Sequence, residues 1–188
     1  DRLAENRIVV RRARRGERIT TLDKETRALD SDTLVIADGQ KPVCIAGIMG
    51  GVDTEVESQT TNVLLEAAVF QGVSIRRTSR RLGLRSEASA RFEKGLDVTR
   101  VTKALDRAAQ LLQEVADGEV CKGTIAVSTV QFRNQVVTLC PERCNKLLGA
   151  DIPREEMIRI LESLEFEVKE KGGELEARGP SHRLDIEL

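Results

Sequence analysis

Short apolar runs bounded by turn residues dominate the first third of the chain, and this pattern predicts strands rather than long helices. The stretch RIVVRRARRGERIT (residues 7–20) alternates around a glycine and predicts a hairpin with one solvated face. Apolar runs at 34–36 and 43–48 flank the turn residues ADGQKP and predict a second pair of strands. Residues 63–65 predict a further strand, which ends at Glu66.

The pattern changes to a helical period after residue 71. GVSIRRTSRRLGL (72–84) predicts a short helix that ends at Gly83, and a second helix begins near Ser86. The clearest helix spans 97–118, with Asp97 and Gly118 as candidate caps. Its apolar residues recur every three or four positions, which predicts a helix of the core: Val98, Val101, Leu105, Ala108, Leu112 and Val115.

A separate small unit follows a predicted connecting strand within 119–132. It contains a strand, helices at 141–148 and 153–164, and strands near 166–170 and 174–180. Pro153 near the first helical position suits a helix start. The expected fold class is α+β, with a mixed sheet-and-helix first domain at 1–125 and a small helix-rich, winged-type module at 130–188.

Composition limits the possible functions. The chain has 188 residues, of which 40% are hydrophobic and 32% charged, as is typical of an ordered globular protein. No apolar run is long enough to span a membrane. The net charge of −1 gives no general nucleic-acid signature, but arginines gather in two stretches, 7–18 and 76–85. Their guanidinium groups suit phosphate contacts, and a merely solvated surface is the alternative.

Few residues are available for metal or nucleophilic chemistry. Cys140 and Cys144 stand four apart, but no histidine or further cysteine joins them at metal-ligand spacing. The only histidine, His182, excludes a zinc site with several histidines, and a Ser-His-Asp or Cys-His arrangement would need it. The chain has no Trp or Tyr and four Phe, so platforms for base stacking are nearly absent.

Three stretches have an unusual composition. GIMGG (47–51) contains three residues without a side chain, which suits either a tight bend or a ligand that approaches main-chain N–H groups. Its glycine spacing fits neither the dinucleotide-binding nor the P-loop pattern. Glu66 is the only charge in the run 63–70, so it lies either at a pocket or in a structural ion pair. GLRSEASARFEKGLD (83–97) gathers small residues, among them Ser86 and Ala88, which suggests that something packs closely against them.

These stretches carry a family resemblance. IAGIMGGVDTEV, TTNVLLEAAVF, RRLGLRSEASARFEKGLD and GPSHRLDI, in this order and spacing, resemble the family of β subunits of bacterial phenylalanyl-tRNA synthetases over almost the whole chain. The resemblance implies an editing domain in the first 125 residues, incomplete at its N-terminal side, and a following module truncated at its C-terminal end. It also implies a cytoplasmic α2β2 enzyme whose α subunits activate phenylalanine with ATP and Mg²⁺ and charge the phenylalanine tRNA.

The resemblance assigns a role to the unusual residues. The family's editing domain hydrolyses tyrosine wrongly attached to that tRNA, and Glu66 matches the carboxylate that meets the tyrosine hydroxyl. Ser86, a position that is often threonine in relatives, and Ala88 match small residues that leave room for the aminoacyl group. Ala46 and Gly47 match the main-chain segment that lines the same cavity. No general base is assigned, because the family's histidine motif would lie upstream of residue 1.

Two further expectations concern ions and RNA. Asp185 matches the first of several acidic residues that bind Mg²⁺ in the family, with an exposed carboxylate as the alternative reading. A set of arginines would contact tRNA phosphates: Arg76, Arg77, Arg80 and Arg81. Two other functions stay open, namely a non-catalytic tRNA-binding or subunit-assembly module, and a free-standing ligand-binding domain related to the editing fold.

Overall fold

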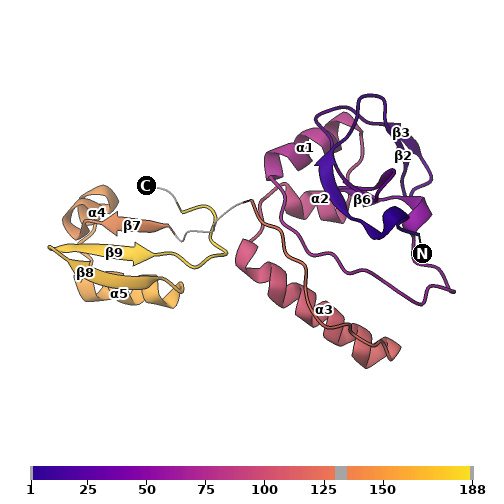
Figure 1. Cartoon of the computed structure of the whole chain (residues 1–188). Helices are drawn as coiled ribbons and strands as arrows, with labels where there is room; N and C mark the ends of the chain where they lie inside the picture. The colour runs from indigo at the N-terminus through magenta and orange to yellow at the C-terminus, as the bar shows by residue number, and fades with distance from the viewer. Residues whose placement is uncertain (1, 130–134, 187–188) are drawn as a thin grey trace. The chain divides into compact units, whose positions relative to one another are not determined.

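The computed structural model describes residues 2–129 and 135–186 (Figure 1). The chain divides into two compact units, and each is treated by itself below. The first comprises Asp1–Leu96 with Ala104–Gln110, and the second comprises Asp97–Lys103 with Leu111–Leu188. Strands and helices are both present, which confirms the α+β class.

A four-stranded antiparallel sheet forms the base of the first unit. Its order is β1-β4-β5-β6, with bounds Val9–Arg12, Leu34–Ala37, Pro42–Ile45 and Met49–Gly50. A separate hairpin joins β2 (Arg18–Thr20) to β3 (Thr26–Ala28). The core of this unit combines residues of the sheet, the loops and the first helix: Ala13, Ile19, Leu29, Val35, Ile45, Ile48, Ile75 and Leu84.

The predicted hairpin across residues 7–20 is wrong, although both of its strands exist. β1 pairs with β4, and β2 pairs with β3. The pairing with β4 continues one residue beyond β1, since the backbone N–H of Ala13 bonds the carbonyl of Thr33 at 2.8 Å. Arg11 then holds Glu17 through an ion pair of 2.7 Å, which fixes the connection between the strands. Pairing with the buried strand β4 lets β1 satisfy its backbone hydrogen bonds.

The second predicted pair of strands is confirmed as β4 and β5, but β5 ends at Ile45. The backbone turns at Gly47, whose φ is +66°, and resumes as β6. The predicted strand at 63–65 is wrong, because residues 61–71 form no strand or helix. Val63 and Leu64 are more than half exposed there. A strand needs a partner for its backbone groups, and none of the described strands pairs with this segment.

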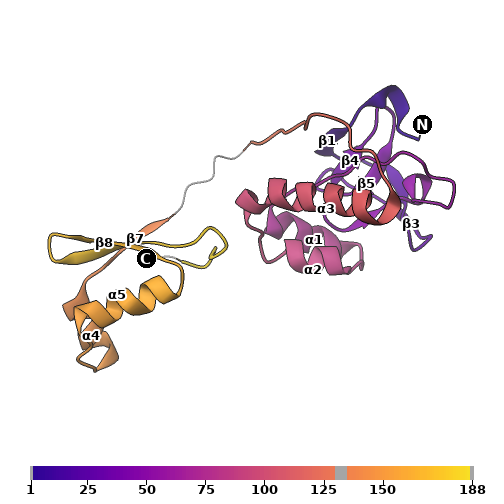
Figure 2. The same ribbon diagram turned by 90° about the horizontal axis from the view of Figure 1, so that it is seen from below.

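Helices complete the first unit and lead into the second. α1 (Gly72–Arg81) ends before Gly83, whose φ of +60° confirms the predicted stop. α2 (Glu87–Phe92) lies beside α1 in both views (Figures 1 and 2), and the two pack together. Short 3-10 turns occupy Ala4–Asn6, Val52–Thr54 and Val98–Arg100.

The predicted core helix is α3 (Val101–Ala116), but both predicted caps and its predicted place in a core are wrong. Asp97 caps the preceding 3-10 turn, and the left-handed residue at the C-terminus is Asp117 (φ +50°) rather than Gly118. No residue of α3 is buried, and Val115 is 78% exposed. Periodicity predicted the helix correctly, but its apolar stripe is not part of a core within the described residues. The predicted strand within 119–132 is not found at 119–129, and residues 130–132 lie outside the described part.

The second unit places two helices on one face of a three-stranded antiparallel sheet (Figure 2). The sheet order is β7-β9-β8, with bounds Val136–Leu139, Glu174–Arg178 and Glu167–Lys171. The helices are α4 (Pro141–Leu148) and α5 (Arg154–Ser163), as predicted, with Pro153 at the N-cap of α5. Met157, Phe166 and Leu175 are among the buried residues. No helix in the described part is long and apolar enough to cross a membrane.

Candidate functional site

The segment that follows β5 lies at the centre of the predicted site, and Glu66 lies near it. Glu66 retains an exposed surface, yet the protein atoms around its carboxyl group raise its pKa above the ordinary value of 4.5. Cys44, on β5, is half-buried, and burial followed by the repulsion of the Glu66 carboxylate raises the pKa of its thiol to about 12. The two groups are therefore close enough to interact.

Glu66 has no hydrogen bond and no ion pair among the described residues. A carboxylate in a partly desolvated position without a counter-charge is costly, which is why structural ion pairs usually neutralise such groups. The structural ion pair that the sequence left open is thus not formed within the described part. The carboxyl group keeps its oxygens available to a ligand.

Two aromatic rings lie close to Gly47. The rings of Phe70 and Phe92 lie 5.1 Å apart between centroids, at an interplanar angle of 51°. A methyl group on Gly47 would lie 2.9 Å from Cδ2 of Phe70, 3.1 Å from Cδ1 of Ile75 and 3.2 Å from Cδ2 of Phe92. Two structural features therefore favour glycine at this position. The bend needs a positive φ, and the neighbouring side chains fill the space that a Cβ would occupy.

Ser86 joins α2 to the same segment. Its hydroxyl donates to the carbonyl of Ile48 at 2.6 Å and accepts from the backbone N–H of Ser89 at 3.1 Å. The Ser89 hydroxyl in turn accepts from the backbone N–H of Ser86, which completes a capping box at the start of α2. The close packing of small residues at 86–90 is thus explained in part by the helix cap itself.

Not every predicted site residue meets the others. Ala46 is 1% exposed and donates its N–H to the carbonyl of Leu34, so its side chain belongs to the core. Ala88 is exposed on the second position of α2. Ala46 and Gly47 both lie within the segment 44–48; the structure brings Ser86 to it through Ile48 and brings Glu66 near it at Cys44. It gives no contact that ties Ala88 to it.

The four candidate phosphate-binding arginines divide into two kinds. Arg81 donates to Thr33 at 2.8 Å and pairs with Asp30 at 2.8 Å, so it ties the end of α1 to the loop before β4. Arg76, Arg77 and Arg80 are exposed and make no contact of this kind within the described residues. Sequence alone gave no means of separating these roles.

Asp185 is engaged by a neighbouring arginine. Arg183 Nε and Nη2 donate to the two carboxylate oxygens at 2.8 and 2.9 Å, and these bonds lower the pKa of Asp185 to about 2. No group of three or more His, Cys, Asp or Glu among the described residues could hold a metal ion. The described surroundings of Asp185 do not fit a Mg²⁺ site, and its role as a ligand stays a prediction.

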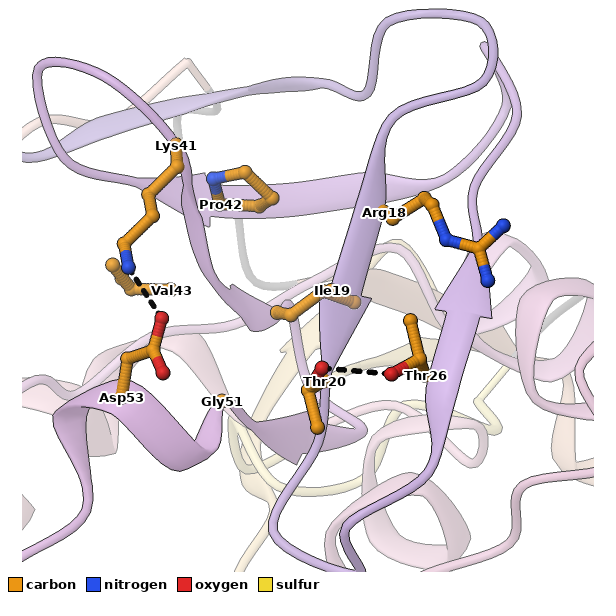
Figure 3. Close-up of a pocket in the computed structure, with 9 residues that line it drawn as sticks. All are labelled: Arg18, Ile19, Thr20, Thr26, Lys41, Pro42, Val43, Gly51 and Asp53. Atoms are coloured by element: carbon orange, nitrogen blue, oxygen red, sulfur yellow. Dashed lines mark hydrogen bonds and ion pairs between the residues drawn. The ribbon is translucent and has the colours of Figure 1, made fainter.

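A cavity of about 160 Å³ lies elsewhere, between the β2–β3 hairpin and the start of β5 (Figure 3). Lys41 and Asp53 form an ion pair at its rim, and the hydroxyl groups of Thr20 and Thr26 meet at 2.9 Å across the hairpin. None of the predicted site residues lines it. Its volume is below the roughly 300 Å³ at which ligand pockets begin, so it is not the preferred site.

Sequence reasoning missed three contributors to the site. Cys44 belongs to the segment 44–48, and Phe70 and Phe92 lie close to its Gly47, but each has the pattern of an ordinary core residue in its own stretch. A glycine between apolar residues was the available signal for the rings, because bulky neighbours often require a missing Cβ. Nothing local indicated that Glu66 would approach Cys44, since 22 positions separate them.

Comparison with known proteins shows consistent similarity. Residues 1–117 match the B3/4 domain family and residues 137–188 match the tRNA synthetase B5 domain family. The chain is 49% identical over 99% of its length to the phenylalanine–tRNA ligase beta subunit of Moorella thermoacetica, and 48% identical over its full length to that of Geobacter metallireducens. It is 44% identical over its full length to the subunit of Bacillus cereus. The chain spans only 23–24% of the length of these relatives.

Proposed function

The chain belongs to the phenylalanine–tRNA ligase β-subunit family, and from this premise we propose that its first unit is the editing part of such a subunit. Its substrate would be tyrosine wrongly esterified to the phenylalanine tRNA, and the reaction would be hydrolysis of that ester. The partners proposed with it are the tRNA and the α subunit. Activation of phenylalanine with ATP and Mg²⁺ is proposed for the whole enzyme and not for any residue of this chain.

The chemical need for a second site follows from the two amino acids. Tyrosine differs from phenylalanine by one hydroxyl group, and an apolar pocket rejects an added hydroxyl only weakly. A site that forms a hydrogen bond with that hydroxyl can instead select tyrosine, because phenylalanine leaves the polar group of the site unpaired. Such a site needs a hydrogen-bond acceptor for the phenol hydroxyl, at a position where water does not fully replace that hydrogen bond.

The unpaired carboxyl group of Glu66 is the observation that carries the proposal. Glu66 keeps an exposed surface near Cys44 of β5 and has no counter-charge among the described residues, while the protein atoms around its carboxyl group raise its pKa. The carboxylate would accept a hydrogen bond from the tyrosine hydroxyl, while Phe70 and Phe92 form an apolar border nearby. Because the pKa of Glu66 is raised, the acceptor form would be lost at a higher pH than for an ordinary glutamate as the solution is acidified.

The remaining groups would position the aminoacyl ester. The turn 46–48, which contains Gly47, would offer main-chain groups to the ester. The hydroxyl of Ser86 holds the carbonyl of Ile48 in place by a hydrogen bond. No side chain is assigned as the general base, and hydrolysis would use a water held by main-chain and substrate groups. Ser86 is a positioning residue in this scheme, since its hydroxyl is already committed to the backbone and the helix cap.

Binding of free L-tyrosine and L-phenylalanine, measured by calorimetry on the 188-residue chain, tests the proposal. A hydrogen bond to a charged acceptor is worth about 1.5–3 kcal/mol, so tyrosine should bind about 10- to 100-fold more tightly. Glu66→Gln and Glu66→Ala should remove the preference. Glu55→Gln, which changes an exposed carboxylate, is the matched control and should preserve it.

Two results would count against the proposal. Equal affinity of the unchanged chain for the two amino acids would show that Glu66 does not read the hydroxyl. A tyrosine preference that survives in Glu66→Gln would place the recognition in another group. Release of tyrosine from mischarged phenylalanine tRNA, followed with the same variants in the full-length subunit with its α partner, would then separate binding from hydrolysis.

A further inference from the structure

Helix α1 has two faces of different character. Its inner face buries Ile75, Thr78 and Ser79, and Ile75 is one of the residues that crowd Gly47 at the candidate site. Its outer face carries Arg76, Arg77 and Arg80, all exposed. Helix α1 therefore lies between Gly47 of the candidate site and a positively charged surface, and a helix with its side chains is about 10–12 Å in diameter.

The charge on the outer face is one-sided. The stretch 72–85, GVSIRRTSRRLGLR, contains five arginines and no acidic residue, although the whole chain has a net charge of −1. Arg76 and Arg80 stand at i and i+4, a spacing at which like charges destabilise a helix by about 0.2–0.5 kcal/mol. Arg80 lies in the last turn, where the helix dipole favours cations, but Arg76 and Arg77 lie further from that end and gain less.

Arg81 does not belong to this surface. Its guanidinium bonds Asp30 and Thr33, and this contact holds the end of α1 to the first unit. The three other guanidinium groups form no ion pair with an acidic side chain in the described part, so they can reach an external anion. We name Arg76, Arg77 and Arg80 the α1 arginine surface.

We propose that the α1 arginine surface binds the phosphate backbone of RNA. A guanidinium group can donate two hydrogen bonds to the oxygens of one phosphate. Several of these groups along one helix face therefore suit a chain of successive phosphates. An acidic protein would be the other anionic partner. Protein interfaces, however, have a centre enriched in apolar and aromatic side chains, and the large apolar side chain exposed on α1 is Val73.

The inference rests on the proposed function for its choice of tRNA as the RNA. A strand bound along the outer face of α1 would run beside the helix whose inner face packs near Gly47, and its aminoacylated end would then have to reach the candidate site. The α1 arginine surface would contribute affinity without reading sequence, because phosphate contacts carry none directly.

The test is the salt dependence of binding between the 188-residue chain and a phenylalanine tRNA transcript, by fluorescence anisotropy from about 50 to about 200 mM KCl. Each lost phosphate contact should reduce the slope of log K against log salt by about 1. For the variant R76Q/R77Q/R80Q, the slope of log K against log salt should therefore be smaller in magnitude by about 2–3. The control R143Q/K146Q/K169Q removes the same charge from exposed positions of the second unit and should keep the slope.

Three results would overturn the inference: no binding of tRNA by the unchanged chain at the lowest salt concentration, an unchanged slope in R76Q/R77Q/R80Q, or an equal loss in the control. Displacement of the tRNA by a polyglutamate peptide of equal charge, at equal concentration, would favour an acidic protein instead. The result is separable from that of the proposed function, because R76Q/R77Q/R80Q should keep the preference for free tyrosine while Glu66→Gln keeps the affinity for tRNA.

Discussion

Replacing Gly47 by alanine tests how the candidate site is built. The change adds one methyl group at a residue with φ of +66°, and this group would lie 2.9 Å from Cδ2 of Phe70. Two costs follow. The left-handed backbone costs a non-glycine residue about 1–2 kcal/mol, and forcing a methyl group into a filled core costs about 1–3 kcal/mol. The free energy of unfolding should therefore fall by about 2–5 kcal/mol.

Gly83→Ala is the matched control. Gly83 has a similar φ of +60°, but no atom lies within 4 Å of the position that its Cβ would take. It should show the backbone cost alone, about 1–2 kcal/mol. The difference between the two variants thus isolates the contact of the new methyl group with Phe70, Ile75 and Phe92.

Urea denaturation at pH 7, followed by circular dichroism, gives both free energies. If the two variants lost equal stability, the steric account of Gly47 would be refuted, and its glycine would instead reflect only the bend or a ligand. A second comparison sharpens the result: Phe70→Leu removes the nearest ring atoms, so adding Gly47→Ala to it should cost less than adding the same change to the unchanged chain.

Three other expectations can be checked on the same chain. Ser86→Ala removes the cap of α2 and the bond to the carbonyl of Ile48, and should cost about 1–2 kcal/mol in urea denaturation, whereas Ser86→Thr keeps a hydroxyl and should cost less. Glu66→Gln should stabilise the chain at pH 7: the folded-state pKa of Glu66 is raised, so its ionisation opposes folding above pH 4.5, and the gain should vanish below that pH. Cys44, with a thiol pKa of about 12, should resist a maleimide at pH 7 in the folded chain, while exposed Cys121 reacts; equal rates would contradict the burial of Cys44.

Local signals predicted most of the helices. Gly83 stops α1, Ser86 caps α2, and Pro153 stands at the start of α5, as the sequence indicated. These features depend on the conformational preferences of one residue and on hydrogen bonds over three or four positions, so the sequence of a short stretch contains them. The family resemblance likewise depended on stretches that can be read one at a time.

The pairing of the strands could not be predicted from short stretches of sequence. β1 and β2 were both predicted, yet they pair with β4 and β3 rather than with each other. Residues 63–65 have the composition of a strand but pair with none in the described part. Composition shows that a segment can be extended, whereas its hydrogen-bond partner lies far away along the chain and depends on which apolar faces the whole fold can bury.

The α+β class, the stop of α1, the cap of α2 and the start of α5 follow from the amino-acid sequence alone, as do the residues chosen as site candidates, whereas both caps of α3 do not. The surroundings of those residues depend on the folded chain: Arg81 anchors a loop while Arg77 on the same helix is exposed, and Glu66 lies near enough to Cys44 to affect its pKa, without a partner among the described residues. The physical reason is that propensity and capping act within a few residues, while burial, desolvation and ion pairing depend on groups that only folding brings together.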